Sequence, residues 1–329
     1  MKLVAINDIH KTSVAPRSRT ADYNEQINAK LLEVVSFCNE YSVDFLLITG
    51  DFFHSINIEN TPYWQCGEAA NILIKCKCPI IAALGNHDWD EVPQRLPYFP
   101  IFYAYKAAKV YFKPVSGRVD IASKWNDLYE FVVINSNDGS NLDDAWDVVN
   151  KLGPTERTRI IVYHGPIVPP SFASTYPTKF MEKAIRLQDL NGIGDFVFYG
   201  DIHDPHSVTE TSNTTFVNYG SLSRNSAKEL HNIRPVYLAY AEFDDASGDA
   251  KIQPVELECV VPAEQAFRTA EILEEKEHDT KVETFVESLG TTTFPVLTPD
   301  ILIDRIEKEE SLMESERNIA VSVIRKITG

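Results

Sequence analysis

The chain has 329 residues, of which 44% are hydrophobic and 24% are charged, so disorder over most of its length is excluded. The formal net charge is -17, so the surface repels polyanions at long range, and no basic stripe is visible. These features exclude a free-standing DNA clamp. They permit catalysis on DNA if bound cations and a partner protein supply positive charge.

The cysteines are odd in number and form no CxxC pair. They are Cys38, Cys66, Cys76, Cys78 and Cys259. We expect all five to be reduced thiols in a cytoplasmic protein, because the i, i+2 spacing of Cys76 and Cys78 has little precedent in metal sites. The N-terminus runs directly into a strand pattern, and no apolar run approaches the roughly 20 residues that span a bilayer. We therefore expect neither a signal peptide nor a membrane segment.

Short apolar runs alternate with stretches of helical periodicity up to about residue 205. Residues 3–6 predict a buried strand, and residues 24–41 predict a helix. The pattern continues with strands at 44–49, 79–84, 131–135, 159–163 and 195–199 and with a helix at 61–76. This alternation predicts an α/β sandwich with helices on the outside.

The pattern changes after residue 205. Strands are predicted at 216–219, 236–243 and 252–257, and the chain becomes helical and charged from Pro262 onward. Residues 290–299 indicate a linker, and residues 300–327 return to helical spacing. We therefore expect three parts, a core of residues 1–205, a β-rich completing portion of residues 206–261 and a charged helical extension of residues 262–329.

Potential metal ligands follow five of the predicted strands. They are Asp8 with His10, Asp51 with His54, Asn86 with His87, His164, and Asp201 with His203. Each motif alone would more often be a turn or a satisfied polar group, but five of the eight histidines lie in these motifs. Because α/β sheets bind ligands at the carboxyl ends of their strands, the combination predicts one shared site.

The donors suit a pair of divalent ions. Asp8 and His10 stand at i and i+2 on one face, Asp51 at a glycine turn can bridge two ions, and the Asn86 amide ligates without cancelling charge. Two ions about 3.5–4 Å apart grip a phosphate ester and lower the pKa of a bridging water. Such a site needs roughly seven N and O donors. The predicted ligands are Asp8, His10, Asp51, Asn86, His164, Asp201 and His203.

In this order, the DxH, GD, GNHD, His-Gly and GxxH motifs resemble those of the calcineurin-like metallophosphoesterases. The resemblance covers about the first 205 residues and implies a four-layer α/β/β/α sandwich. It further implies two ligand groups. One ion would be held by Asp8, His10, Asp51 and His203, and the other by Asp51, Asn86, His164 and Asp201.

A closer resemblance is to the SbcD-type nucleases. It is carried by Gly50-Asp51-Phe52-Phe53-His54, which is similar to their GDxF(D/H) motif, and by Tyr219-Gly220-Ser221-Leu222-Ser223-Arg224. It implies a DNA exo/endonuclease of repair or recombination that acts with an SbcC-type coiled-coil ATPase. Such a nuclease uses two divalent ions, for which Mn²⁺ is expected and Mg²⁺ or another divalent ion is the alternative. Residues 300–329 would be the segment that docks on this ATPase. An ordinary helix packed within the chain is an equally good interpretation of the same residues. A homodimer is a further expectation.

The last motif departs from the family pattern, since Asp201 stands where the usual GHxH sequence has its first histidine. Three carboxylates then face two divalent ions, which leaves a formal charge of +1 rather than +2. We expect tighter metal retention, weaker Lewis acidity and a preference for manganese or magnesium over zinc.

His87 is the predicted general acid, with Asp88 holding its ring, and His54 is predicted to orient the substrate. The alternatives are an orienting role for His87 and a turn role for His54.

Other candidate residues carry weaker expectations. His206 is a weak candidate for an eighth ligand, and His231 and His278 are assigned no chemistry. Arg17, Arg19 and Arg224 could meet a phosphate backbone or lie in solvated loops. A cluster of aromatic residues could stack on nucleotide bases, or it could belong to the core or to a partner surface. Its members are Trp89, Tyr98, Phe99, Phe102, Tyr103 and Tyr105.

Two other functions stay open. The same ions would serve a cyclic-nucleotide or small phosphodiester hydrolase or a phosphomonoesterase, because all use in-line attack on phosphorus. A non-catalytic scaffold is the third possibility, and the intact ligand set argues against it.

Overall fold

The computed structural model describes residues 1–55, 61–88, 99–136, 141–225, 234–268, 298–309 and 312–328. The chain divides into two compact units, Met1–Phe267 and Arg268–Gly329. Among the described residues, no helix is long and apolar enough to cross a membrane.

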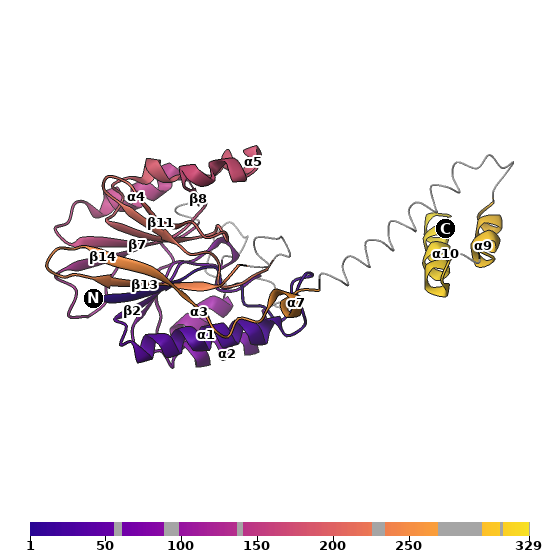
Figure 1. Ribbon diagram of the computed structural model, residues 1–329, viewed down its shortest axis with the longest axis horizontal. Helices are drawn as coiled ribbons and strands as arrows, with labels where there is room; N and C mark the ends of the chain where they lie inside the picture. The colour runs from indigo at the N-terminus through magenta and orange to yellow at the C-terminus, as the bar shows by residue number, and fades with distance from the viewer. Residues whose placement is uncertain are drawn as a thin grey trace. The chain divides into compact units, whose positions relative to one another are not determined.

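The first unit is a mixed α/β sandwich of two six-stranded sheets (Figure 1). The first sheet has the order β14-β13-β1-β2-β3-β4. Its strands are β1 (Lys2–Ile6), β2 (Phe45–Ile48), β3 (Ile80–Ala82), β4 (Tyr111–Phe112), β13 (Tyr237–Phe243) and β14 (Ala250–Glu256). The central strands β1, β2 and β3 are parallel and buried on both faces, as continuous apolar runs predict.

The second sheet has the order β11-β12-β10-β7-β6-β5. Its strands are β5 (Gly117–Val119), β6 (Tyr129–Ile134), β7 (Thr158–His164), β10 (Phe196–Gly200), β11 (Ser207–Glu210) and β12 (Thr215–Asn218). Strands β6, β7, β10 and β12 are parallel. A small sheet pairs β8 (Ile167–Val168) with β9 (Ile185–Arg186).

Three apolar layers hold the sandwich together. Helices α1 (Tyr23–Glu40), α2 (Tyr63–Leu73) and α3 (Phe99–Ala107) pack on the outer face of the first sheet. Residues such as Leu47 and Phe131 fill the space between the two sheets. Helix α4 (Leu142–Leu152) packs on the outer face of the second sheet. The four-layer α/β/β/α prediction is therefore confirmed (Figure 1).

Short elements complete the first unit. They are the 3-10 helices η1 (Asn86–Asp88), η2 (Pro170–Thr175) and η3 (Leu187–Leu190) and the helices α5 (Thr178–Met181) and α7 (Ala263–Ala266). Residues 206–261 supply two strands to each large sheet, and residues 263–267 still belong to the first unit. The proposed boundaries at residues 205 and 261 stay a prediction.

The described part of the second unit is a pair of helices, α9 (Pro299–Glu307) and α10 (Glu314–Thr328). They pack on each other through Ile306, Ala320 and Val321. Among the side chains described in this unit, the exposed large apolar ones are Ile301, Ile319 and Val323 on the two helices and Met313 just before α10.

Candidate metal centre

The predicted ligands all lie at the carboxyl ends of parallel strands. Strands β1, β2 and β3 deliver Asp8, Asp51 and Asn86 from the first sheet, and β7 and β10 end at His164 and just before Asp201 in the second. Contacts across the sandwich join the two sets, since the Asp201 N–H donates to Asp8 Oδ1 at 3.0 Å. Donors far apart in the sequence thus converge at one end of the fold.

One half of the cluster gathers around His10. Its Nε2 lies 2.9 Å from Nε2 of His203 and 3.6 Å from Oδ2 of Asp51. Asp8, His10 and His203 each place a donor atom within 4.8 Å of the others. These four side chains form the first predicted ligand group.

The other half gathers around His164. Its Nε2 lies 3.1 Å from Oδ1 of Asn86, 3.5 Å from Oδ1 of Asp51 and 3.7 Å from Oδ1 of Asp201. Asp51 therefore turns one carboxylate oxygen toward each half, which is the position a bridging ligand needs. The assignment of the seven side chains as ligands stays a prediction, and this geometry supports it.

The ring of His164 is oriented for ligation. Its Nδ1 lies 2.7 Å from the Thr49 carbonyl oxygen, so Nδ1–H donates there and the Nε2 lone pair faces the cluster.

Backbone conformation singles out the same residues. Seven non-glycine residues among those described have positive φ, and four of them are Asp8 (46°), His10 (48°), Asp51 (48°) and Asp201 (96°). Such conformations cost about 1–3 kcal/mol each and persist where the surroundings enforce them. The strand ends are therefore bent to aim these side chains into one space.

Two glycines make room for the cluster. A Cβ on Gly85 would collide with the Asp51 carboxylate, and a Cβ on Gly50 would collide with the His164 ring. Gly50 also has a φ of +105°, which favours glycine.

The buried carboxylates of the cluster would be stabilised by bound cations. Burial raises the pKa of Asp8 to about 8, and it raises the pKa of Asp201. Burial opposes a charge on His164, but Asp51, Asp8 and Asp201 raise the pKa of its imidazole to about 9. Among the described residues, Asp8 Oδ2 is a buried oxygen without a hydrogen-bond partner. Divalent ions would satisfy this oxygen and neutralise the carboxylates, so the donor set fits a metal site.

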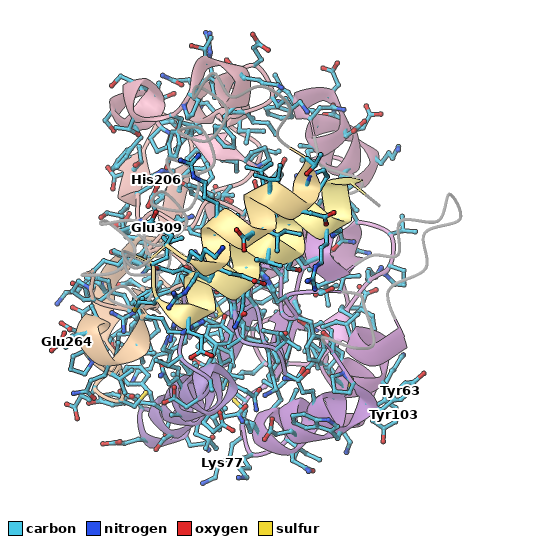
Figure 2. The ribbon with its side chains drawn as sticks, turned by 90° about the vertical axis from the view of Figure 1, so that its right-hand side faces the viewer. Tyr63, Lys77, Tyr103, His206, Glu264 and Glu309 are labelled. Atoms are coloured by element: carbon cyan, nitrogen blue, oxygen red, sulfur yellow. The ribbon has the colours of Figure 1, made fainter. Side chains whose placement is uncertain are left out.

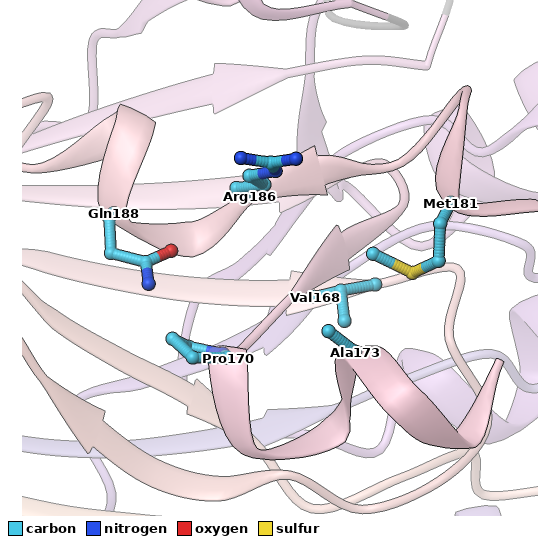
Figure 3. Close-up of a pocket in the computed structure, with 6 residues that line it drawn as sticks. All are labelled: Val168, Pro170, Ala173, Met181, Arg186 and Gln188. Atoms are coloured by element: carbon cyan, nitrogen blue, oxygen red, sulfur yellow. The ribbon is translucent and has the colours of Figure 1, made fainter. Parts of the chain in front are cut away.

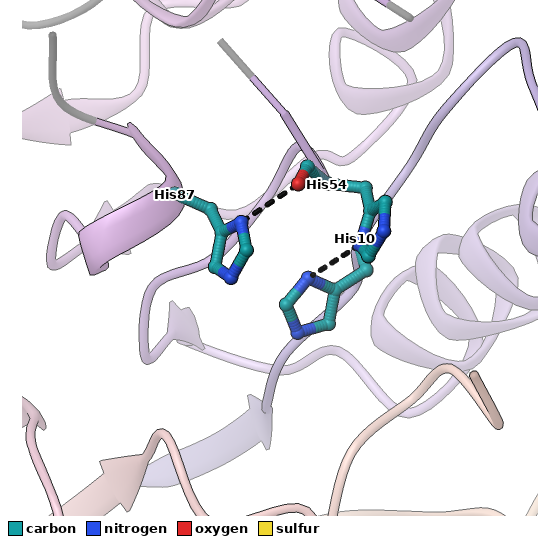
Figure 4. A group of neighbouring side chains, drawn as sticks. All are labelled: His10, His54 and His87. Carbon is teal, nitrogen blue, oxygen red and sulfur yellow. Dashed lines mark hydrogen bonds between the residues drawn. The ribbon is translucent and has the colours of Figure 1, made fainter. Parts of the chain in front are cut away.

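Two further imidazoles stand beside the first ligand group (Figure 4). His54 places Nδ1 3.4 Å from Nδ1 of His10, and the His54 and His87 rings stack with centroids 5.6 Å apart. The Nδ1 of His87 lies 2.7 Å from the His54 carbonyl oxygen, and its Nε2 lies 4.0 Å from Oδ2 of Asp51. Both rings are partly exposed, so they can meet a substrate that approaches the cluster.

Asp88 does not have the expected partner. Its buried carboxylate accepts backbone N–H groups of Gly85 (2.9 Å), Phe52 (3.2 Å) and Phe53 (3.4 Å) instead of the His87 ring. Asp88 therefore ties the loop after β2 to the loop after β3. The orientation of His87 comes from the His54 carbonyl group.

The structure gives His206 a packing role. Its ring is buried and lies 2.9 Å from the Tyr199 hydroxyl and 3.1 Å from the Tyr176 hydroxyl. Burial lowers the pKa of this imidazole to about 4. The ring therefore anchors the segment after His203, and nothing here supports an eighth ligand.

The arginine expectations need correction. Arg19 and Arg224 are buried and not in solvated loops, because Arg19 bonds the Ala266 carbonyl oxygen at 2.8 Å and Arg224 bonds that of Val261. Arg17 is exposed. Tyr105 is a core residue, whereas Tyr103 of α3 is exposed, as is Tyr63 of α2 (Figure 2). Of the other predicted groups, His231, His278, Trp89, Tyr98 and the Phe99 and Phe102 side chains lie outside the description.

Arg234 is a residue that the sequence did not single out. Its guanidinium donates to the Ser221 and Ser223 carbonyl oxygens at 2.8 and 2.9 Å. Ser223 in turn donates its hydroxyl to the Asp8 carbonyl oxygen at 3.1 Å. Arg234 thus supports the backbone of a predicted ligand through Ser223, and no sequence pattern marks such an indirect contact.

A pocket lies between β8, β9 and η2 (Figure 3). Its lining is largely apolar with one cation, and it consists of Val168, Pro170, Ala173, Met181, Arg186 and Gln188. The lining contains no carboxylate or imidazole, so this pocket is not a second metal site.

The family model for calcineurin-like phosphoesterases matches residues 1–205. No curated protein matches the chain. Among the solved structures that match, one crystal structure has 14% sequence identity and a TM-score of 0.43, and the match covers 77% of this chain and 98% of the other. That likeness is too distant to inform the function.

Proposed function

Because this chain belongs to the calcineurin-like phosphoesterase family and is thus a metal-dependent hydrolase of phosphoester bonds, we propose that it is a DNA exo/endonuclease of the SbcD type. It would act with an SbcC-type ATPase in DNA repair or recombination. The observation that carries the proposal is the pair of partly exposed imidazoles, His54 and His87, beside the two ligand groups.

Two divalent ions would be held by the His10 and His164 halves of the cluster, with Asp51 between them. When bound, they would supply Lewis acidity toward a phosphate ester and lower the pKa of an attacking water. We propose Mn²⁺ as the preferred ion because the cluster contains three carboxylates.

The chain's own residues would handle the leaving group. Because Nδ1–H of His87 donates to the His54 carbonyl oxygen, its Nε2 is available to protonate a leaving alkoxide. Oδ2 of Asp51 lies 4.0 Å from that nitrogen. The stacked ring of His54 would contact the scissile phosphate and orient it.

DNA binding would be shared with the partner. The net charge of -17 disfavours binding of a polyanion such as DNA, whereas bound metal ions would attract the DNA phosphates locally. The exposed apolar side chains of α9 and α10 suit a partner helix of the coiled-coil kind.

The test compares three substrates with the full chain and Mn²⁺: linear duplex DNA, bis-p-nitrophenyl phosphate and p-nitrophenyl phosphate. We expect cleavage of DNA and of the diester without turnover of the monoester. Asp51→Ala, which removes the shared ligand, controls for contaminating nucleases and should abolish every activity.

Other outcomes would overturn the proposal. Monoester or small-diester turnover without DNA cleavage would favour the small-substrate hydrolase. An inert protein that binds no metal would favour the scaffold.

A further inference from the structure

Three cysteines meet at the opposite end of the first sheet from the metal centre. Cys38 lies in the last turn of α1, and Cys76 and Cys78 lie in the segment that leads from α2 into β3. Their sulfur atoms all lie within 4.8 Å of one another, and the Cys76 and Cys78 sulfurs are 3.4 Å apart. Cys66 and Cys259 do not belong to this group. The fold thus brings Cys38, which is distant in the sequence, next to Cys76 and Cys78, whose spacing in the sequence alone did not indicate a metal site.

The sulfur spacing fits a thiolate-bound metal ion. A zinc–sulfur bond of about 2.3 Å in tetrahedral geometry separates the sulfurs by about 3.8 Å. The three thiols already approach this separation. Cys38 is buried and the other two are half-buried, so an ion would be held against the fold and keep one side open to water.

The cluster is positioned by groups other than the thiols. The Asn39 side chain accepts the Lys77 N–H at 2.8 Å and donates to the Lys75 carbonyl oxygen at 2.9 Å. The Cys76 N–H donates to the Leu73 carbonyl oxygen at 3.0 Å. Because these bonds hold the segment to α1, a metal ion would meet a preorganised set of ligands.

Local charge also suits a cation bound by thiolates. The carboxyl-terminal ends of α1 and α2 point their carbonyl dipoles at this region, and dipoles of that sign favour cations. A divalent ion with three thiolates carries a formal charge of -1, which Lys75 and the outward-pointing Lys77 (Figure 2) can offset.

We propose that Cys38, Cys76 and Cys78 form a second, structural metal site for Zn²⁺ or another thiolate-preferring divalent ion, with water in the fourth position. The ion would tie the end of α1 to the start of β3. Strand β3 leads on to Asn86 and His87, so the site would stabilise an element that carries part of the metal centre. Its ligands are sulfur atoms, which separates it chemically from the oxygen- and nitrogen-rich centre.

The first test uses Co²⁺ as a probe with the reduced full-length chain. Cobalt bound to thiolates absorbs in the near ultraviolet through sulfur-to-metal charge transfer, which oxygen and nitrogen ligands do not produce. With Co²⁺ in excess over all sites, we expect the amplitude of this band to correspond to one thiolate-bound ion per chain, because the oxygen- and nitrogen-rich centre adds no such band, and we expect the band to disappear when Zn²⁺ is added. Cys38→Ser and Cys76→Ser should lose the band, and Cys259→Ser, a half-buried thiol outside the group, should keep it.

The second test needs no variant. Zn²⁺ should protect Cys76 and Cys78 of the natural chain from iodoacetamide, while Cys259 stays reactive, as read by mass spectrometry of the peptides. Absence of the cobalt band, equal loss of the band in Cys259→Ser, or unprotected Cys76 and Cys78 would overturn the proposal. A disulfide among these cysteines in protein isolated without reductant would also overturn it.

Discussion

Single residues at this centre adopt conformations that cost free energy. Asp8, His10, Asp51 and Asp201 all have positive φ, and Asp8 keeps a buried oxygen without a hydrogen-bond partner. These costs are concentrated at the predicted ligands. A metal-bound state would offset them, because the ions attract the carboxylates that burial disfavours.

His87→Ala tests the proton donor. Removing the ring should lower kcat for DNA or a diester by about 100-fold or more, the usual contribution of a general acid. Metal content, measured by elemental analysis, should stay unchanged because His87 is not among the predicted ligands. His54→Ala is the comparison and should mainly raise KM. Full turnover in His87→Ala would disprove the assignment.

Gly85→Ala tests the packing behind Asp51. The added methyl group collides with the Asp51 carboxylate, so this ligand must shift. We expect Mn²⁺ affinity, measured by calorimetry, to fall about 10- to 100-fold. Gly67→Ala is the matched control, since no atom within 4 Å meets its methyl group. Equal affinities in the two variants would contradict the structure.

Asp201→His tests metal preference. A neutral imidazole restores the usual family residue and raises the formal charge of a two-ion centre from +1 to +2. We expect weaker metal retention on dialysis and a higher ratio of Zn²⁺- to Mn²⁺-supported activity. An unchanged ratio would mean that this carboxylate does not set the preference.

At the scale of elements, the loop after β12 supports the loop after β1. Arg234 binds Ser221 and Ser223, and Ser223 binds the backbone of Asp8. Arg234→Gln leaves buried carbonyl oxygens with fewer donors and should cost about 1–3 kcal/mol of unfolding free energy in urea titrations. It should also weaken metal binding, because the Asp8 loop loses support.

Arg159→Gln is the control for that prediction. Arg159 is likewise buried, but it pairs with Glu130 at 2.7 Å on another part of the second sheet. The Arg159→Gln variant should therefore have a lower free energy of unfolding and an unchanged affinity for metal ions. If both variants bind Mn²⁺ like the natural chain, the proposed link from Arg234 to Asp8 is wrong.

Periodic elements were predictable, and those defined by tertiary contacts were not. Helix α1 was predicted within one residue at each end, since its buried positions repeat along one face. Helix α4 was equally predictable, because six of its eleven residues are apolar and recur at helical spacing and because its Asn141 cap accepts the Asp144 N–H, but it was not predicted. Strand β11 is mostly polar and exposed, so it shows no burial pattern.

The same limit applies to the site. Side chains at strand ends could be predicted to converge, because parallel strands place their carboxyl ends together. The partners of Asp88 could not be predicted, since its donors belong to backbone groups that meet only in the fold. The burial of Arg19 could not be predicted either, because nothing in the sequence indicates that a charged residue in a polar segment will be buried.

At the scale of the whole molecule, the two units suggest a division of tasks. The first unit contains the metal centre, and the described part of the second unit is a helix pair with a small apolar contact of its own. The exposed side chains of Ile301 and Ile319 add little to that contact. We therefore expect the second unit to serve association and not hydrolysis.

Ile301→Asp combined with Ile319→Asp tests this division. Both positions are exposed, so the charges should leave folding and diester hydrolysis unchanged, while they should abolish co-purification with a coexpressed coiled-coil ATPase and its stimulation of DNA cleavage. Val115→Asp, a change at an exposed apolar residue of the first unit, is the control and should keep both. Retained binding in the double variant would exclude this face of the helix pair as the docking surface. Loss of diester hydrolysis would instead show that the second unit contributes to the catalytic centre.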